Sequence, residues 1–163
     1  AVKLAAALGA EVTLFTTAAA KAADARRLGA RQVVISSDEV TMREAARTLD
    51  IVLDCVAAAH DLNPYLACLK TFGQLVLVGI PDQPHAAPDV TPLVFRRLSL
   101  SGTSIGSIKE TQDMLDFCGR HELVADVELI AMEQVESAFQ RMARGDVKYR
   151  FVVDMLASHW PGA

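Results

Sequence analysis

The sequence predicts an α/β fold built on a doubly wound parallel sheet. Hydrophobic residues make up 52% of the 163 residues but aromatic residues only 6%, which favours aliphatic packing of helices against strands buried on both faces. Short apolar segments alternate with short helical segments along the chain, the pattern expected when helices connect neighbouring parallel strands.

Glycine, proline and capping signals place the elements in order. Gly9 and Gly29 are typical helix ends, and Ser107 is a plausible helix cap. Four of the six prolines fall within residues 81–92, which predicts a loop there. We expect helices over 1–9, 18–28, 39–49, 62–70 and 109–121, and strands over 11–16, 32–35, 50–56, 72–80 and 98–103.

The pattern changes near residue 125. A short strand over 127–130 is followed by a helix over 133–144, which Gly145 closes, and by a strand over 149–154. The sequence therefore predicts a first domain over 1–124 and a second segment over 125–163.

Charge and composition exclude several classes of function. The formal net charge is −4 and the basic residues are dispersed, which argues against a nucleic-acid partner. The apolar run 75–80 is far too short to span a membrane. The cysteines and histidines follow no metal-binding or redox spacing. We expect Cys55, Cys68 and Cys118 to be buried thiols in a reducing compartment, the cytoplasm.

Thr16, Thr17 and Lys21 follow the first expected strand, at a position where a protein that binds NAD usually carries an acid for the ribose 2′-hydroxyl. Two hydroxyls and an ammonium instead suit the 2′-phosphate of NADP. The alternative is that the threonines cap the next helix and the lysine is a solvated surface residue. These three residues alone leave both interpretations open.

Six segments in this order carry a family resemblance: Leu-Phe-Thr-Thr, Asp-Cys-Val-Ala-Ala-Ala-His, Leu-Val-Leu-Val-Gly-Ile, Ser-Gly-Thr-Ser-Ile-Gly-Ser, Glu-Thr-Gln-Asp-Met-Leu-Asp-Phe-Cys and Gly-Asp-Val-Lys-Tyr-Arg-Phe-Val-Val-Asp. With them the chain resembles the zinc-dependent medium-chain alcohol dehydrogenases, in the branch of cinnamyl alcohol dehydrogenases and NADP-dependent aldehyde reductases. The resemblance runs from residue 1 to about residue 154.

The resemblance implies a C-terminal fragment of a longer enzyme. The first strand of the Rossmann domain and its glycine-rich turn would precede residue 1, and the zinc ligands would also lie upstream. Residues 1–124 would then be an incomplete NADP-binding domain, and residues 125–163 would return to the catalytic domain. No catalytic residue and no metal ligand would fall within this chain.

The same resemblance assigns the cofactor contacts. On pattern alone, Val56 and Val78 equally fit core positions, and Gly79 fits a simple turn at the end of a strand. The resemblance places the 2′-phosphate at Thr16, Thr17 and Lys21, the riboses at Val56 and Ala57, the nicotinamide end at Val78, Gly79 and Ile80, and the carboxamide at Thr103, Ser104 and Ile105.

The expected parent is an NADP(H)-dependent alcohol dehydrogenase or aldehyde reductase with a small alcohol or aldehyde as substrate. It would form a homodimer through strand 98–103 and would have no membrane or nucleic-acid partner. Two alternatives are compatible with the sequence. One is a zinc-free enzyme resembling quinone oxidoreductases that binds NADPH, and the other is a non-catalytic module for nucleotide binding or dimerisation.

Overall fold

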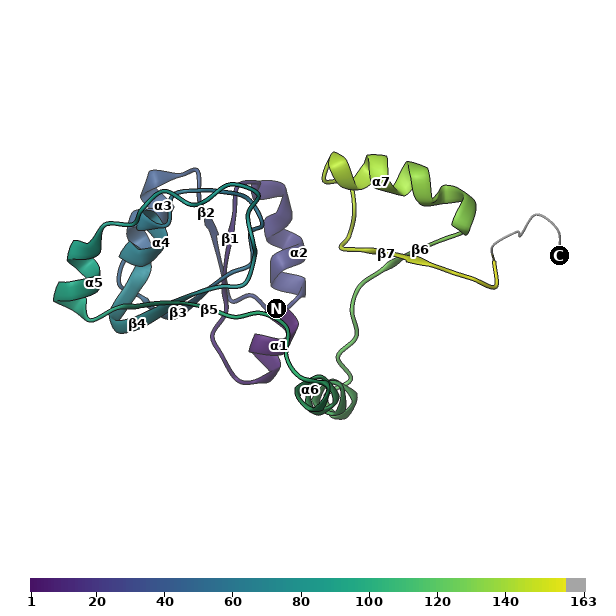
Figure 1. The fold of residues 1–163 in the computed structure, drawn as a ribbon, viewed down its shortest axis with the longest axis horizontal. Helices are drawn as coiled ribbons and strands as arrows, with labels where there is room; N and C mark the ends of the chain where they lie inside the picture. Colours follow the sequence, from purple (N-terminus) through teal and green to yellow (C-terminus); the bar gives the residue numbers. More distant parts are fainter. Residues whose placement is uncertain (158–163) are drawn as a thin grey trace. The chain divides into compact units, whose positions relative to one another are not determined.

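The structure is a computed structural model that describes residues 1–157. It divides into two compact units, Ala1–Phe117 and Cys118–Ala163, and the part of the second unit after residue 157 lies outside the described residues. Strands and helices alternate through the first unit (Figure 1). The α/β architecture with parallel strands is therefore confirmed, while the domain boundary after residue 124 stays a prediction.

The elements match most of the expected ones, with shorter bounds. In chain order they are α1 (Val2–Ala7), β1 (Thr13–Thr16), the 3₁₀ helix η1 (Ala19–Lys21), α2 (Ala22–Arg27), β2 (Gln32–Ile35), α3 (Glu39–Glu44), β3 (Leu49–Asp54), α4 (Asn63–Cys68), β4 (Leu69–Leu77), α5 (Val90–Arg96), β5 (Ser99–Gly102) and α6 (Ile108–Arg120).

The strands of the first unit form two parallel ladders. One is β1–β2 and the other has the order β3–β4–β5, and among the described residues β1 and β3 are not paired with each other. In the larger ladder Leu75 lies between Val52 and Leu100. Because the strands in a ladder are parallel, their carboxyl ends lie along the same edge, where ligands bind in open α/β sheets.

Two expected boundaries are wrong. The helix expected over 39–49 ends at Glu44, and the strand expected over 72–80 already begins at Leu69. Arg47 adopts a left-handed conformation with φ 58°, and its N–H donates to the carbonyl of Ala67 at 3.1 Å. These contacts between distant segments end the helix and let Leu49 pair with Leu69.

The loop predicted over 81–92 extends too far, because helix α5 already begins at Val90. The carboxylate of Asp89 caps this helix by accepting a hydrogen bond from the N–H of Thr91 at 2.8 Å, which also lowers the pKa of Asp89. Pro92 lies in the first turn, where a helix tolerates proline because the N–H there needs no partner within the helix.

The cap predicted for α6 is confirmed. The N–H of Glu110 donates to Ser107 Oγ at 3.2 Å, and the N–H of Ser107 donates to Glu110 Oε2 at 2.6 Å. This reciprocal pair is a capping box, and the hydrogen bonds from Ser107 lower the pKa of Glu110.

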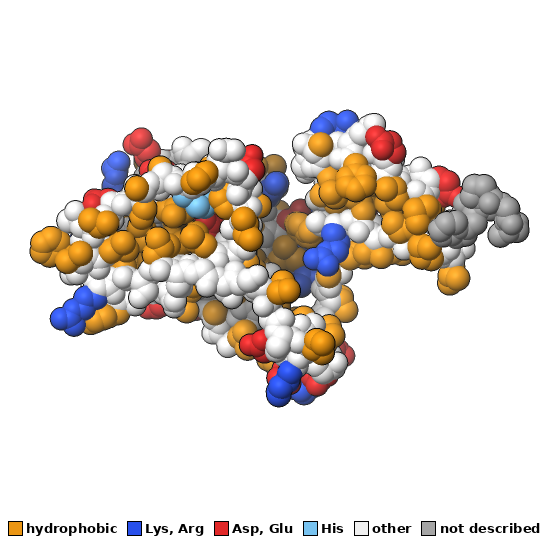
Figure 2. All heavy atoms as spheres, in the orientation of Figure 1, with side chains coloured by type: hydrophobic (Ala, Val, Ile, Leu, Met, Phe, Trp, Pro, Cys, Tyr) orange, Lys and Arg blue, Asp and Glu red, His pale blue; other side chains and the backbone are white. Residues whose placement is uncertain are grey.

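Helix α4 joins two hydrophobic clusters of the first unit. Leu66 packs with β3 and β4 residues in one cluster, and Cys68 packs with Val34 and Ala45 in the other. The opposite face of β3 is exposed, with Ile51 at 59% and Leu53 at 51%. The prediction that strands are buried on both faces is therefore wrong for β3 within the described residues. Figure 2 accordingly shows hydrophobic side chains on the surface of the molecule.

The second unit is built from β6 (Glu128–Ile130), the 3₁₀ helix η2 (Met132–Gln134), α7 (Val135–Ala143) and β7 (Phe151–Val153). Strands β6 and β7 pair in parallel. Arg141 of α7 donates to Glu128 at 2.8 Å and to Asp146 at 2.9 Å, and its guanidinium lies 4.8 Å from the centre of the Phe151 ring. This one side chain therefore links the helix to both strands and to the Gly145–Asp146 turn.

The expectation of three buried cysteines is correct for Cys68 alone. Cys68 is buried and Cys118 is partly buried, but Cys55 is exposed in the loop that directly follows β3. Burial raises the pKa of the Cys68 thiol. None of the helices in residues 1–157 has both the length and the apolar character needed to cross a membrane.

We predict that Leu66→Ala lowers the free energy of unfolding by about 2–5 kcal/mol, because Leu66 is fully buried and the change would leave a cavity beside β3 and β4. Leu115→Ala, at a side chain that is 53% exposed, should change it by only about 0.5 kcal/mol. Denaturant titration of both variants measures this, and equal losses would contradict the core described above.

Candidate functional site

The end of β3 is hydrogen-bonded to the end of β4 through one backbone carbonyl group, that of Asp54. The carbonyl oxygen of Asp54 accepts hydrogen bonds from the N–H of Val78 at 2.8 Å and of Gly79 at 3.2 Å. A Cβ on Gly79 would lie only 2.4 Å from the carbonyl oxygen of Val56. Glycine is therefore required here for close backbone approach, and the structure brings the predicted residues Val56 and Gly79 into contact.

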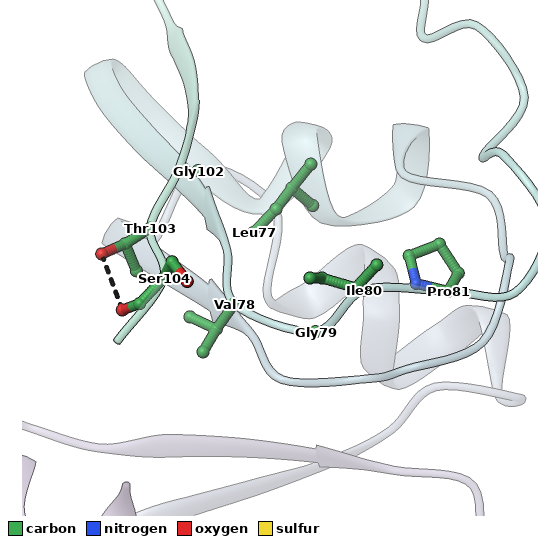
Figure 3. A pocket seen from close by; sticks show the side chains of 8 residues that line it. All are labelled: Leu77, Val78, Gly79, Ile80, Pro81, Gly102, Thr103 and Ser104. Atoms are coloured by element: carbon green, nitrogen blue, oxygen red, sulfur yellow. Dashed lines mark hydrogen bonds between the residues drawn. The ribbon is translucent and has the colours of Figure 1, made fainter. Parts of the chain in front are cut away.

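A hollow of about 440 Å³ lies at the carboxyl ends of β4 and β5 (Figure 3). Such a volume is within the usual range of small-molecule sites. Its walls are largely apolar, with the side chains of Thr103 and Ser104 on the β5 side. The residues that line it are Leu77, Val78, Gly79, Ile80, Pro81, Gly102, Thr103 and Ser104.

Five of the predicted cofactor residues therefore meet at this hollow, namely Val78, Gly79, Ile80, Thr103 and Ser104. Ile105, predicted with them, is 95% exposed and does not line it. Val56 and Ala57 lie on the neighbouring loop and are also exposed. The alternative that Val56 and Val78 are core residues is wrong, since they are 52% and 42% exposed.

Thr16, Thr17 and Lys21 lie at the carboxyl end of β1. Thr16 Oγ1 accepts a hydrogen bond from the N–H of Ala18 at 3.2 Å, which leaves its hydroxyl hydrogen free to be donated. The helix-capping alternative is wrong for both threonines, because neither η1 nor α2 has a side-chain cap. Thr17 is exposed.

Lys21 ends η1 with an exposed side chain. It forms no ion pair with any other residue in the described part of the chain, and the acid nearest along the helix, Asp24, pairs with Arg27 at 3.7 Å. No neighbouring carboxylate therefore neutralises the ammonium, which suits an anionic ligand. A solvated surface lysine would have the same features.

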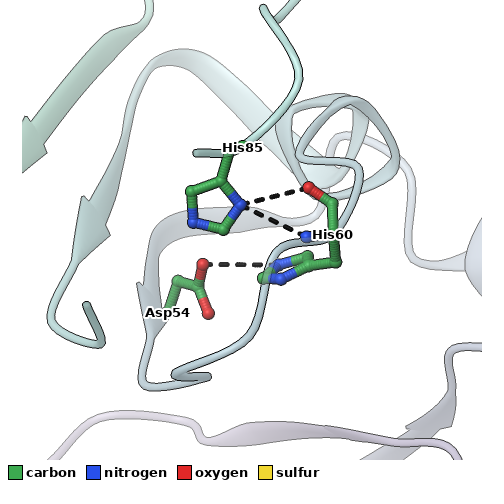
Figure 4. A group of neighbouring side chains, drawn as sticks. All are labelled: Asp54, His60 and His85. Atoms are coloured by element: carbon green, nitrogen blue, oxygen red, sulfur yellow. Dashed lines mark hydrogen bonds and ion pairs between the residues drawn. The ribbon is translucent and has the colours of Figure 1, made fainter. Parts of the chain in front are cut away.

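Folding also brings together three side chains that no sequence spacing singled out. Asp54, at the end of β3, lies next to His60 and His85 from the two following loops (Figure 4). Asp54 Oδ1 accepts from the N–H of Val56 at 3.0 Å, so the carboxylate also supports the predicted cofactor loop. The signal that could have indicated it is the acid Asp54 at the carboxyl end of β3, directly after the apolar run 51–53.

Comparison with known proteins identifies a family. Residues 1–120 match the family described as zinc-binding dehydrogenase. The chain is 47% identical over 153 residues to aldehyde reductase YahK of Escherichia coli, a match that covers 94% of this chain and 44% of that protein.

Two solved structures share the fold. A cinnamyl alcohol dehydrogenase of Sorghum bicolor matches with a TM-score of 0.94 at 39% identity, covering 99% of this chain and 46% of that one. A cinnamyl alcohol dehydrogenase of Helicobacter pylori, solved with NADP(H), matches with a TM-score of 0.84 at 31% identity, covering 97% and 45%. The chain thus spans less than half the length of these relatives.

We predict that Gly79→Ala lowers the free energy of unfolding by about 1–3 kcal/mol, the usual cost of overpacking, because the new methyl group would meet the Val56 backbone. The matched control is Gly119→Ala in α6, where a Cβ has no neighbour within 4 Å. That change should stabilise the helix by up to about 1 kcal/mol. Thermal and denaturant unfolding compare the two, and a neutral Gly79→Ala would refute the close approach.

Proposed function

Because the chain belongs to the zinc-binding dehydrogenase family, we propose that it is the cofactor-binding part of an NADP(H)-dependent alcohol dehydrogenase or aldehyde reductase. The single observation that carries the cofactor preference is the exposed ammonium of Lys21, which has no ion-pair partner among the described residues and follows Thr16 and Thr17 closely in the chain, after a strand end that lacks an acid. The relative solved with NADP(H) supports the same preference.

The predicted residues suit the two ends of the cofactor differently. Lys21, Thr16 and Thr17 would bind the 2′-phosphate through charge-assisted and hydroxyl hydrogen bonds. Val56 and Ala57 would pass beside the riboses, and the hollow would receive the nicotinamide. There Val78, Gly79 and Ile80 would form one wall, and Thr103 and Ser104, followed by Ile105, would offer their backbone to the carboxamide.

The apolar walls would exclude water from the nicotinamide and fix which face of the ring meets the substrate. When bound, the nicotinamide supplies hydride exchange with the carbon of a small alcohol or aldehyde. The lining of the hollow carries no histidine, cysteine or carboxylate, so it cannot hold a catalytic zinc ion. In this proposal the zinc of the family, which would polarise the substrate oxygen, is held by residues outside the chain, and the enzyme acts in the cytoplasm.

We predict that Lys21→Ala weakens NADPH binding by about 1.5–3 kcal/mol, the cost of one charged hydrogen-bonded contact, and leaves NADH binding nearly unchanged. Fluorescence titration of the protein with both cofactors measures the difference. Lys109→Ala removes another exposed ammonium, one that pairs with Asp113, and should affect neither cofactor. Equal losses for NADPH and NADH would reject the 2′-phosphate assignment.

We also propose that the protein forms a homodimer through β5. This strand pairs only with β4 among the described strands, and the unpaired N–H and C=O groups of an edge strand usually need cover. The N–H of Thr103 donates inward to Leu77 at 2.9 Å. The N–H groups of successive residues in a strand point to opposite sides. Leu100, three residues before Thr103, therefore directs its N–H outward, toward the position of a second copy.

We predict that Leu100→Pro yields monomers or aggregates, because proline removes this outward donor. Leu100→Val keeps the N–H group and suits a strand, so it should remain dimeric. Light scattering of both variants gives the mass, and a dimer of native size for Leu100→Pro would place the interface elsewhere.

A further inference from the structure

Asp54, His60 and His85 form a cluster of potential metal ligands, called here the Asp-His-His cluster. One ligand atom from each residue lies within 4.8 Å of the others, and Figure 4 shows the three side chains close together. Asp54 is only 8% exposed, and both histidines are partly buried. None of the three lines the hollow described above.

The hydrogen bonds of His60 leave a lone pair facing the carboxylate. Its Nδ1 lies 2.9 Å from the carbonyl oxygen of Ala58, and a carbonyl only accepts, so Nδ1 carries the hydrogen and donates. In the neutral ring Nε2 is then an acceptor. It lies 3.3 Å from Asp54 Oδ2, and two acceptors at this distance need a proton or a cation between them.

His85 repeats this arrangement. Its Nδ1 lies 3.2 Å from the carbonyl oxygen of His60 and 3.3 Å from the N–H of the same residue. When Nδ1 donates to the carbonyl, Nε2 has a free lone pair. That Nε2 is buried without a hydrogen-bond partner among the described residues. In the other tautomer an N–H group would be buried without an acceptor, which is also unfavourable.

Asp54 completes the set. Its Oδ1 is satisfied by the N–H of Val56, whereas Oδ2 is buried with no hydrogen-bond partner in residues 1–157. A proton on His60 would neutralise this oxygen through the ion pair but would leave His85 Nε2 unsatisfied. A divalent cation accounts for all three atoms at once.

We propose that the Asp-His-His cluster binds a divalent transition-metal ion of the zinc type through Asp54 Oδ2, His60 Nε2 and His85 Nε2. Histidines that bind metal usually donate the other ring N–H to a carbonyl or carboxylate, as His60 does here and as His85 does in the tautomer with its hydrogen on Nδ1. Two imidazoles and a carboxylate are a common zinc ligand set that leaves a position for water.

The distance between His60 Nε2 and Asp54 Oδ2 suits such an ion, and the three potential ligand atoms lie within 4.8 Å of one another. Zinc–ligand bonds of about 2.0–2.1 Å in a tetrahedron place ligand atoms about 3.4 Å apart, close to the 3.3 Å between His60 and Asp54. The ion would bridge the loop after β3 and the loop after β4. It would thereby stabilise the edge of the sheet that carries Val56 and Gly79.

The test is the number of zinc ions bound by the protein. Metal analysis after equilibration with Zn²⁺ and dialysis should find one ion fewer per chain in the His60→Ala/His85→Ala double variant than in the wild type. His121→Ala, which removes a histidine outside the cluster, should keep the wild-type number. Any zinc held elsewhere in the protein is common to all three proteins and cancels. An unchanged number in the double variant overturns the proposal.

A second measurement follows the histidines directly in the wild-type protein. In protein labelled with ¹⁵N-histidine, Zn²⁺ should shift the Nε2 resonances of His60 and His85 and leave the other two histidines unchanged. Asp54→Asn, which keeps the side-chain shape, should weaken the affinity for Zn²⁺ in this titration at least about tenfold. If Zn²⁺ produces no shift, or if His60 holds protons on both nitrogens in excess Zn²⁺, the cluster is only an ion pair and the proposal fails.

Discussion

The register of β3 against β4 determines where Val56, Val78 and Gly79 of the candidate site lie. The carbonyl oxygen of Asp54 receives the N–H groups of Val78 and Gly79, so the two strands end at the same level. Because glycine has no Cβ, the backbone at Gly79 can lie directly against the backbone of Val56. Shifting this pairing by one residue would reverse the faces of β4 and remove Val78 and Gly79 from the hollow.

The site has a polar end and an apolar end, each at the end of a different ladder. Thr16, Thr17 and Lys21 follow β1, whereas the hollow lies where β4 and β5 end. A dinucleotide has the same two-ended character, with a phosphorylated ribose at one end and a flat ring at the other. This correspondence, together with the family match, supports the proposed binding of NADP.

Asp54 contributes three different oxygens to this edge. Its backbone carbonyl aligns β4, its Oδ1 holds the N–H of Val56, and its Oδ2 faces His60. A buried carboxylate is costly unless it is paired. The proposed cation would offset that cost and join the same two loops that carry the predicted cofactor residues.

Local signals in the sequence determined the elements whose ends depend on the nearest few residues. Gly9, Gly29 and Gly145 end their helices with positive φ angles of 87°, 108° and 69°, and Ser107 caps α6, because these features need no distant partner. The family resemblance supplied the candidate residues at the hollow and the cofactor they would bind.

The tertiary structure alone decided the features that depend on distant contacts. The end of α3 depends on a hydrogen bond between Arg47 and Ala67, and the exposure of Val56 and Val78 depends on what packs over the strand ends. The Asp-His-His cluster joins residues up to 31 positions apart, from Asp54 to His85. Burial and proximity of this kind arise only when the parallel strands bring their following loops to one edge, which no local pattern in the sequence encodes.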